Sequence, residues 1–154
     1  ELVLVSKLAP GGATEKLIDE LAIGDVVRTV SGIDDTELAD LLASAEIAAV
    51  PSLYEGFSLP AVEAMSCGTP LVASRAGAIP EVVGDAGLLV PPGDAEQLAA
   101  GLAGLFDDPA ERRRLGAKGR DRVLERYSWA AVAAQTAAIY DKAIAAHREG
   151  KNGC

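Results

Sequence analysis

The chain has 154 residues, of which 49% are hydrophobic and 24% are charged, and its formal net charge is −9. This composition is typical of one globular domain and excludes a disordered chain or a membrane-spanning segment. The negative charge disfavours non-specific binding of nucleic acid or of an anionic membrane surface. The two cysteines, Cys67 and Cys154, are too few for a disulfide framework or a zinc site, so we expect a reducing compartment.

In chain order, short apolar runs alternate with segments of helical periodicity. Such alternation predicts an α/β fold, a Rossmann-like doubly wound parallel sheet followed by C-terminal helices. The predicted strands, which we expect to be buried, cover residues 2–5, 26–30, 47–50, 70–74 and 87–90. The predicted helices cover residues 13–21, a segment capped by Asp34 or Asp35 whose apolar stripe reaches Ala45, and residues 60–65, 79–83, 95–106, 109–127 and 129–147. Asp94 and Ser128 are the expected N-caps of the helices that follow them.

We expect residues 1–127 to form the α/β domain, residues 128–149 a C-terminal helix and residues 150–154 a frayed tail. Trp129 and Tyr140 are expected to anchor the last helix, either on this domain or on another one. Because Glu1 leads directly into the first strand and no signal peptide precedes it, the sequence is expected to be a segment of a longer protein.

Parallel α/β sheets bind ligands at the loops that follow the carboxyl ends of their strands. One such loop, residues 51–60, leaves a strand, turns at Gly56 and enters a helix at Pro60. Backbone N–H groups and the positive end of that helix favour an anion such as a diphosphate. Gly56 would let a ligand approach the backbone closely, because it has no Cβ.

Two carboxylates flank this turn, Glu55 before it and Glu63 in the helix. Carboxylates accept hydrogen bonds from paired hydroxyls, so each could bind a sugar or a ribose. A second interpretation remains open from the residues alone, in which Glu55 is solvated and Glu63 only stabilises the helix N-terminus. Their spacing does not indicate a glycosidase acid/base pair, which requires two carboxyl groups across one bond.

Glu55 and Glu63 are separated by seven residues, an E-x7-E spacing, and the surrounding motif resembles that of the family 4 retaining glycosyltransferases. These enzymes have the GT-B architecture, in which two Rossmann-like domains face each other. The resemblance covers nearly the whole chain: residues 31–38, Pro51-Ser52, residues 64–70, 72–74, 77–83 and 87–94, Ser128-Trp129 and the Tyr140 helix.

The resemblance implies the C-terminal half of a hexosyltransferase that uses a nucleotide-diphosphate sugar such as a UDP- or GDP-sugar. It implies that Glu63 binds the donor ribose and that Glu55 is catalytic, holding and orienting the transferred sugar. The backbone of Gly56, Phe57, Ser58 and Leu59 would contact the sugar and the diphosphate, and Ile33, after Gly32, would lie against the base. Neither a metal nor a further cofactor is expected, because helix dipoles and cations would stabilise the leaving diphosphate.

The sequence also departs from this family. The first strand–helix unit, which carries an Arg and a Lys for the diphosphate, is missing, and so is the N-terminal acceptor domain. In the strand order 3-2-1-4-5-6 the missing strand is central, so the segment alone is expected to be inactive. The resemblance implies a cytoplasmic location, and peripheral association with the cytoplasmic face of the membrane would require the missing part. The alternatives are a non-catalytic Rossmann-like scaffold module and, less favoured, a GT-B epimerase or phosphorylase.

Overall fold

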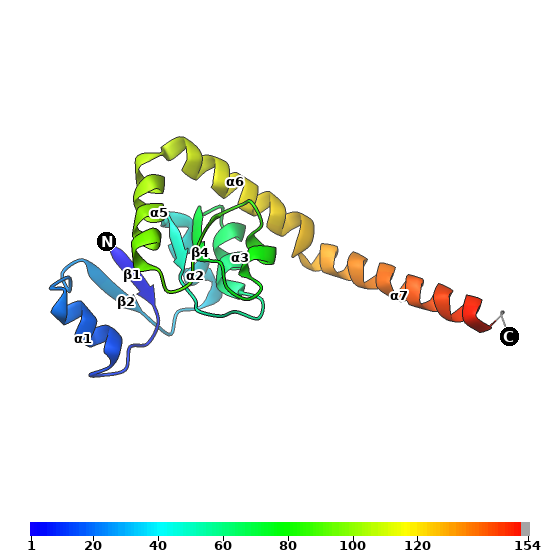
Figure 1. Cartoon of the computed structure of the whole chain (residues 1–154), viewed down its shortest axis with the longest axis horizontal. Helices are drawn as coiled ribbons and strands as arrows, with labels where there is room; N and C mark the ends of the chain where they lie inside the picture. Colours follow the sequence, from blue (N-terminus) through cyan, green and yellow to red (C-terminus); the bar gives the residue numbers. More distant parts are fainter. Residues whose placement is uncertain (152–154) are drawn as a thin grey trace. The chain divides into compact units, whose positions relative to one another are not determined.

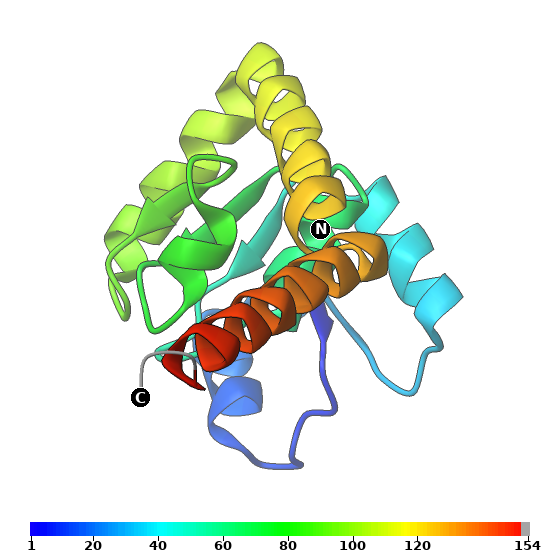
Figure 2. The same cartoon turned by 90° about the vertical axis from the view of Figure 1, so that its right-hand side faces the viewer.

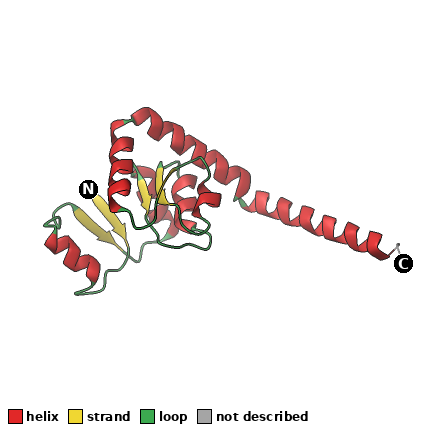
Figure 3. Ribbon diagram, in the orientation of Figure 1, coloured by secondary structure: helices red, strands yellow, loops and turns green. Residues whose placement is uncertain are grey.

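The structure is a computed structural model that describes residues 1–151. The chain divides into two compact units, Glu1–Leu38 and Ala39–Cys154, and each unit is described by itself. In both units parallel strands alternate with helices (Figure 1 and Figure 3). The last three residues of the predicted tail, 152–154, lie outside the described residues.

The first unit contains β1 (Leu2–Val5), α1 (Ala13–Glu20) and β2 (Val27–Val30). The two strands pair in parallel, with Leu2 opposite Val27 and Val5 opposite Val30. Burial of β1 was predicted, but Leu2 and Val5 are about half exposed, at 50% and 49%. The unit contains one complete helix, which is too little structure to cover both faces of its two-stranded sheet.

Helix α2 (Asp35–Ser44) begins with a capping box. Asp34 Oδ1 accepts hydrogen bonds from the backbone N–H groups of Thr36 and Glu37, both at 2.9 Å, and Glu37 Oε2 accepts one from the Asp34 N–H at 2.9 Å. The reciprocal bonds satisfy N–H groups that would otherwise lack partners in the first turn. Of the two aspartates expected to cap this helix, Asp34 is therefore the cap.

The second unit is built on a three-stranded parallel sheet in the order β3-β4-β5. All four residues of the central strand β4 are buried, and the first three of them, Leu71, Val72 and Ala73, are apolar, as burial on both faces of a sheet requires. The largest fully buried side chains of the core include Met65, Leu71, Ile79 and Val83. The elements of this part are β3 (Ala48–Val50), α3 (Leu59–Ser66), β4 (Leu71–Ser74), α4 (Ile79–Val83) and β5 (Leu88–Val90).

The predicted parallel α/β architecture is confirmed. Strand β1 pairs with β2, and β4 pairs with both β3 and β5, always in parallel. These are the pairings that the second to sixth strands have in the order 3-2-1-4-5-6.

Three helices complete the second unit: α5 (Ala95–Asp107), α6 (Pro109–Arg126) and α7 (Trp129–Lys151). Asp94 caps α5 by accepting a hydrogen bond from the Gln97 N–H at 3.0 Å. Ser128 Oγ accepts one from the Ala131 N–H at 3.2 Å, so both predicted caps are confirmed. The α6 and α7 helices meet at an angle (Figure 2).

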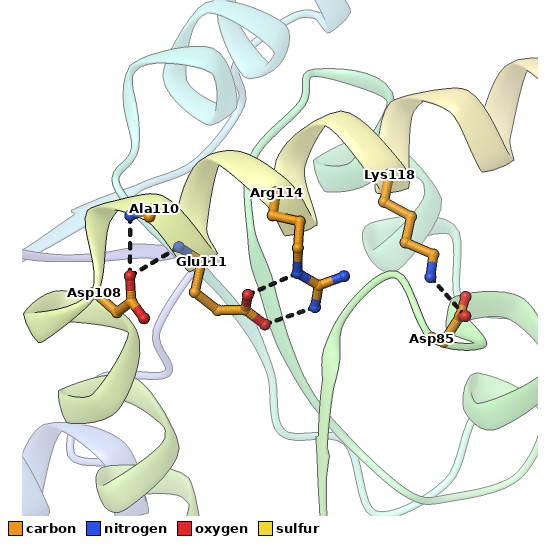
Figure 4. Close-up of polar contacts among 6 residues, drawn as sticks. All are labelled: Asp85, Asp108, Ala110, Glu111, Arg114 and Lys118. Atoms are coloured by element: carbon orange, nitrogen blue, oxygen red, sulfur yellow. Dashed lines mark hydrogen bonds and ion pairs between the residues drawn. The ribbon is translucent and has the colours of Figure 1, made fainter.

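Several polar contacts lie along the first three turns of α6 (Figure 4). Asp108 Oδ1 caps the helix by accepting hydrogen bonds from the Ala110 and Glu111 N–H groups, at 3.0 and 2.9 Å. Within the helix, Arg114 pairs with Glu111 at 2.6 Å, and Lys118 Nζ reaches Asp85 Oδ2, in the turn between α4 and β5, at 2.6 Å. The helix that packs against α3 is thereby also tied to the turn before β5.

The α7 helix does not use its large aromatic side chains to pack on its own unit. Trp129 is 90% exposed and Tyr140 is 65% exposed, so the expectation that they anchor the helix on this domain is wrong. Ile139 and Ile144 are exposed on the same helix. Among the described residues, no helix combines the length and the apolar character needed to cross a membrane.

Candidate functional site

The loop from Pro51 to Ser58 leads from the carboxyl end of β3 into α3. Ser58 is the N-cap residue of α3 and has a left-handed backbone conformation, with φ 77° and ψ 72°. This conformation is uncommon for a residue with a side chain and costs on the order of 1–3 kcal/mol. Pro60 lies in the first turn of the helix, as predicted. The chain thus makes a sharp, strained turn at the point where the backbone N–H groups of α3 become free.

The hydroxyl group of Ser58 lies at the same turn. Its side chain is buried, with 2% of the residue exposed, and Oγ has no hydrogen-bond partner among the described residues. Burial of an unpaired hydroxyl is unfavourable, so a buried hydroxyl in a native structure usually bonds another protein group, an ordered water molecule or a ligand. Together with the positive end of α3, this hydroxyl makes the turn suited to an anion with several oxygens.

Glu55 is held from two sides in this loop. Its Oε1 accepts a hydrogen bond from Ser52 Oγ at 2.8 Å, and its backbone carbonyl accepts one from the Ala78 N–H at 2.9 Å. The residue is half-buried. Sequence reasoning singled out neither Ser52 nor Ala78 as a partner of Glu55. The only available signal was a hydroxyl three residues before a carboxylate in a loop.

Glu63 lies in the second turn of α3, opposite the face that packs into the core. That buried face is formed by Ala61, Ala64 and Met65. Glu63 is half-buried, and no described residue donates a hydrogen bond to its carboxylate. The carboxylate is therefore available to accept hydrogen bonds from hydroxyl groups of a ligand.

Several residues between the two acids are exposed, although Ser58 is buried. The ring of Phe57 packs edge-on against Tyr127, at the end of α6, with the ring centroids 5.5 Å apart and the planes at 81°. Gly56 and Leu59 are exposed. A Cβ added to Gly56 would meet no described atom within 4 Å, so the missing side chain leaves space beside the backbone.

Gly32 and Ile33 follow β2 in the first compact unit. Gly32 is exposed and has φ +70°, and Ile33 is half-buried. The residues from Glu55 to Glu63 belong to the second unit, where the structure brings them together around one turn. The contact of Ile33 with a base therefore remains a prediction.

A hollow of about 170 Å³ lies at the carboxyl ends of the three-stranded sheet. Pro51, Ser74 and Val90, which end or follow the three strands, line it together with Asp94. Neither Glu55 nor Glu63 is among its lining residues. Within residues 1–151 there is no group of three or more His, Cys, Asp or Glu side chains placed to hold a metal ion.

Comparison with known proteins identifies relatives along most of the chain. Residues 12–122 match the family described as "Glycosyl transferases group 1". The chain is 64% identical over 148 residues to the MMP alpha-(1->4)-mannosyltransferase of Mycolicibacterium hassiacum. This match covers 94% of this chain and 36% of that relative. The chain therefore spans about a third of the length of this curated relative.

Two solved structures resemble the chain in fold. The sucrose-phosphate synthase of Thermosynechococcus elongatus matches with a TM-score of 0.82 and 40% identity, over 94% of this chain and 39% of that chain. Anabaena HepE in complex with UDP-glucose matches with a TM-score of 0.76 and 25% identity, over 84% of this chain and 36% of that chain. In each case one part of a longer protein corresponds to this chain.

Proposed function

Since the chain belongs to the glycosyl transferases group 1, a GT-B family, we propose that it is the donor-binding portion of a family 4 retaining hexosyltransferase. The observation that carries this proposal is the turn before α3. There a buried Ser58 hydroxyl, which has no hydrogen-bond partner within residues 1–151, and the free N–H groups of a helix lie between two half-buried carboxylates, Glu55 and Glu63.

In this proposal the diphosphate of a nucleotide-sugar binds at the turn. The backbone N–H groups of Gly56, Phe57 and Leu59 and the hydroxyl of Ser58 donate to its oxygens. The positive end of α3 stabilises the negative charge that grows on the diphosphate as it leaves. A nucleoside diphosphate rather than an inorganic anion is favoured because hydroxyl-binding carboxylates flank the turn on both sides.

The two carboxylates have different partners in the proposed complex. Glu63 accepts hydrogen bonds from the ribose hydroxyls, and Glu55 accepts them from the hydroxyls of the transferred sugar and orients its anomeric carbon. Ile33, after Gly32, packs against the base. The bond from the anomeric carbon to the diphosphate breaks, and a bond from the acceptor oxygen forms on the same face. The acceptor hydroxyl transfers its proton to an oxygen of the departing diphosphate in this step.

The nature of the donor and the rest of the enzyme are also part of the proposal. The structure of HepE contains UDP-glucose, and the relative from M. hassiacum is named a mannosyltransferase, which supports a UDP- or GDP-hexose as donor. An N-terminal domain would bind the acceptor, in keeping with relatives about three times as long as this chain. We propose a cytoplasmic location and a transfer step that needs no metal or further cofactor.

A donor screen tests the proposal. A polypeptide that carries this chain together with the proposed N-terminal domain is titrated with UDP, GDP and ADP by calorimetry. It is then incubated with the corresponding hexose donors and an acceptor library, with mass spectrometry as the readout. Binding of one nucleoside diphosphate and transfer with retained anomeric configuration are expected. Failure of the folded protein to bind any of them would favour the scaffold module instead.

A further inference from the structure

The carboxylate of Glu55 has a hydrogen-bond partner in the protein, Ser52, that has no role in the proposed binding of the nucleotide-sugar. Ser52 Oγ donates a hydrogen bond to Glu55 Oε1 at 2.8 Å, in a partly buried setting. A glutamate in a loop has several accessible rotamers, and one hydrogen bond from a fixed hydroxyl selects among them. Ser52 binds Oε1, and no described residue donates a hydrogen bond to Oε2. Oε2 is therefore the oxygen available to a ligand.

The backbone of Glu55 is fixed from the opposite side by the segment that leads into α4. Gly77 has φ +54°, and a Cβ at this position would overlap the carbonyl oxygen of Glu55 and lie 3.0 Å from its nitrogen. The next residue, Ala78, donates its N–H to the same carbonyl at 2.9 Å. A residue with a side chain would therefore be unfavourable at position 77 for two reasons: the backbone is in the left-handed region, and a Cβ would collide with the backbone of Glu55.

Resting on the proposed function, we propose that Ser52 is a positioning residue for sugar transfer. It holds the Glu55 carboxylate in the orientation that aligns the transferred sugar, while Gly77 and Ala78 fix the Glu55 backbone. Ser52 acts through Glu55 and does not itself touch the donor.

Other contacts hold the loop without the Ser52 hydroxyl. Phe57 packs against Tyr127, and Ser58 begins α3. Loss of the hydroxyl should therefore release the carboxylate of Glu55 but leave the turn that binds the diphosphate in place. The sugar would still bind, but in a less reactive orientation, because small misalignments of a reacting centre reduce the rate strongly.

The test uses Ser52→Ala and Ser52→Thr in the polypeptide with both domains. Ser52→Ala should lower kcat about tenfold, the effect of one lost hydrogen bond to a charged group. The KM for the donor and the Kd for the nucleoside diphosphate should change less than twofold. Ser52→Thr retains the hydroxyl and should recover most of kcat. As a matched control, Ser44→Ala removes an exposed hydroxyl that donates to the Leu41 carbonyl at 2.9 Å, and should leave all three constants unchanged.

Three results would overturn the inference alone, and a fourth would overturn the proposed function together with the inference. An unchanged kcat in Ser52→Ala shows that the hydroxyl has no positioning role. A parallel loss of nucleoside diphosphate affinity and melting temperature shows a structural role for the loop. An equally impaired Ser52→Thr variant shows that shape and not the hydroxyl matters. If the unsubstituted protein transfers no sugar at all, the proposed function itself fails, and the inference fails with it.

Discussion

Gly116 of α6 lies directly against Gly68, the residue after the C-cap of α3, so that a Cβ on Gly116 would overlap the Gly68 carbonyl oxygen. Near by, a Cβ on Gly119 would come within 3.1 Å of Met65 Cγ. Both glycines are buried. They let α6 pack closely behind α3, the helix whose N-terminus forms the proposed diphosphate site.

Gly116→Ala should lower the free energy of unfolding by about 1–3 kcal/mol, because overpacking against backbone forces the two helices apart. Urea unfolding of the chain measures the change. Gly104→Ala is the matched control, since Gly104 lies in α5 with no described atom within 4 Å of an added Cβ. In a helix this substitution should be neutral or stabilise by up to about 1 kcal/mol. Equal effects of the two substitutions would contradict the close packing of α6 on α3.

Glu63→Ala should weaken binding of the nucleoside diphosphate by about 1.5–3 kcal/mol, or roughly 10- to 100-fold, because it removes hydrogen bonds from ribose hydroxyls to a charged group. Calorimetry on the polypeptide with both domains measures the affinity. Glu125→Ala, which removes an exposed carboxylate from α6, should leave it unchanged. An unaltered affinity in Glu63→Ala would remove Glu63 from the donor site.

Gly56→Val should leave the fold intact, because no described atom lies within 4 Å of an added Cβ. It should weaken binding of the nucleotide-sugar, because in the proposed complex the ligand occupies the space beside Gly56. We expect at least a tenfold loss of affinity, as a side chain there would displace the sugar or the diphosphate from the backbone. The melting temperature is measured on the same samples. Normal affinity at an unchanged melting temperature would show that the ligand does not approach this backbone.

Removal of metal ions should not affect the transfer step, because the proposed charge stabilisation comes from α3 and backbone N–H groups. The initial rate is measured before and after dialysis against EDTA, and again after Mg²⁺ or Mn²⁺ is added back. Rates within twofold of each other are expected in all three conditions. A loss with EDTA that either cation reverses would establish a metal requirement.

The ion pair between Asp85 and Lys118 should make stability depend on pH in a defined direction. The hydrogen bond from Lys118 lowers the pKa of Asp85 below its usual range. A depressed pKa in the folded state stabilises the protein above the unfolded-state value of about 4, and this contribution is lost as the pH falls through the folded-state value. Glu111 behaves in the same way, because Arg114 lowers its pKa.

Lys118→Ala should therefore lower the urea midpoint slightly at pH 7, and the difference from the unsubstituted chain should shrink below about pH 4. Both side chains are exposed, at 41% and 77%, so the effect should be small and should decrease further in high salt. Lys142→Ala, in exposed α7, serves as the control and should show no such trend. A difference that is the same at every pH would assign the loss to packing of the lysine stem instead of the ion pair.

Much of the fold could be predicted from local patterns. Three of the four residues of the run Leu71–Ser74 are apolar, and the run forms the fully buried central strand; Asp94 and Ser128 cap the helices that follow them. These features depend on near neighbours in the chain, so the order of residues is enough to indicate them. Leu2–Val5 shows where this fails, since its apolar run forms a strand whose ends remain half exposed. Burial depends on how much of the fold surrounds a strand, which the strand's own sequence does not contain.

The same division holds at the candidate site. Amino-acid order alone determined that a glycine turn, a helix start and two carboxylates with seven residues between them occur after the third strand. Only the tertiary structure decided that Ser52 binds Glu55, that Gly77 lies against the Glu55 backbone and that the Ser58 hydroxyl is buried with no partner in the described part of the chain. The approach of Gly77 to Glu55 arises where the loop meets the segment that leads into α4, a helix that begins some twenty residues later. Spacing along the chain carries no information about such approaches, because packing between distant segments sets the distances and the burial.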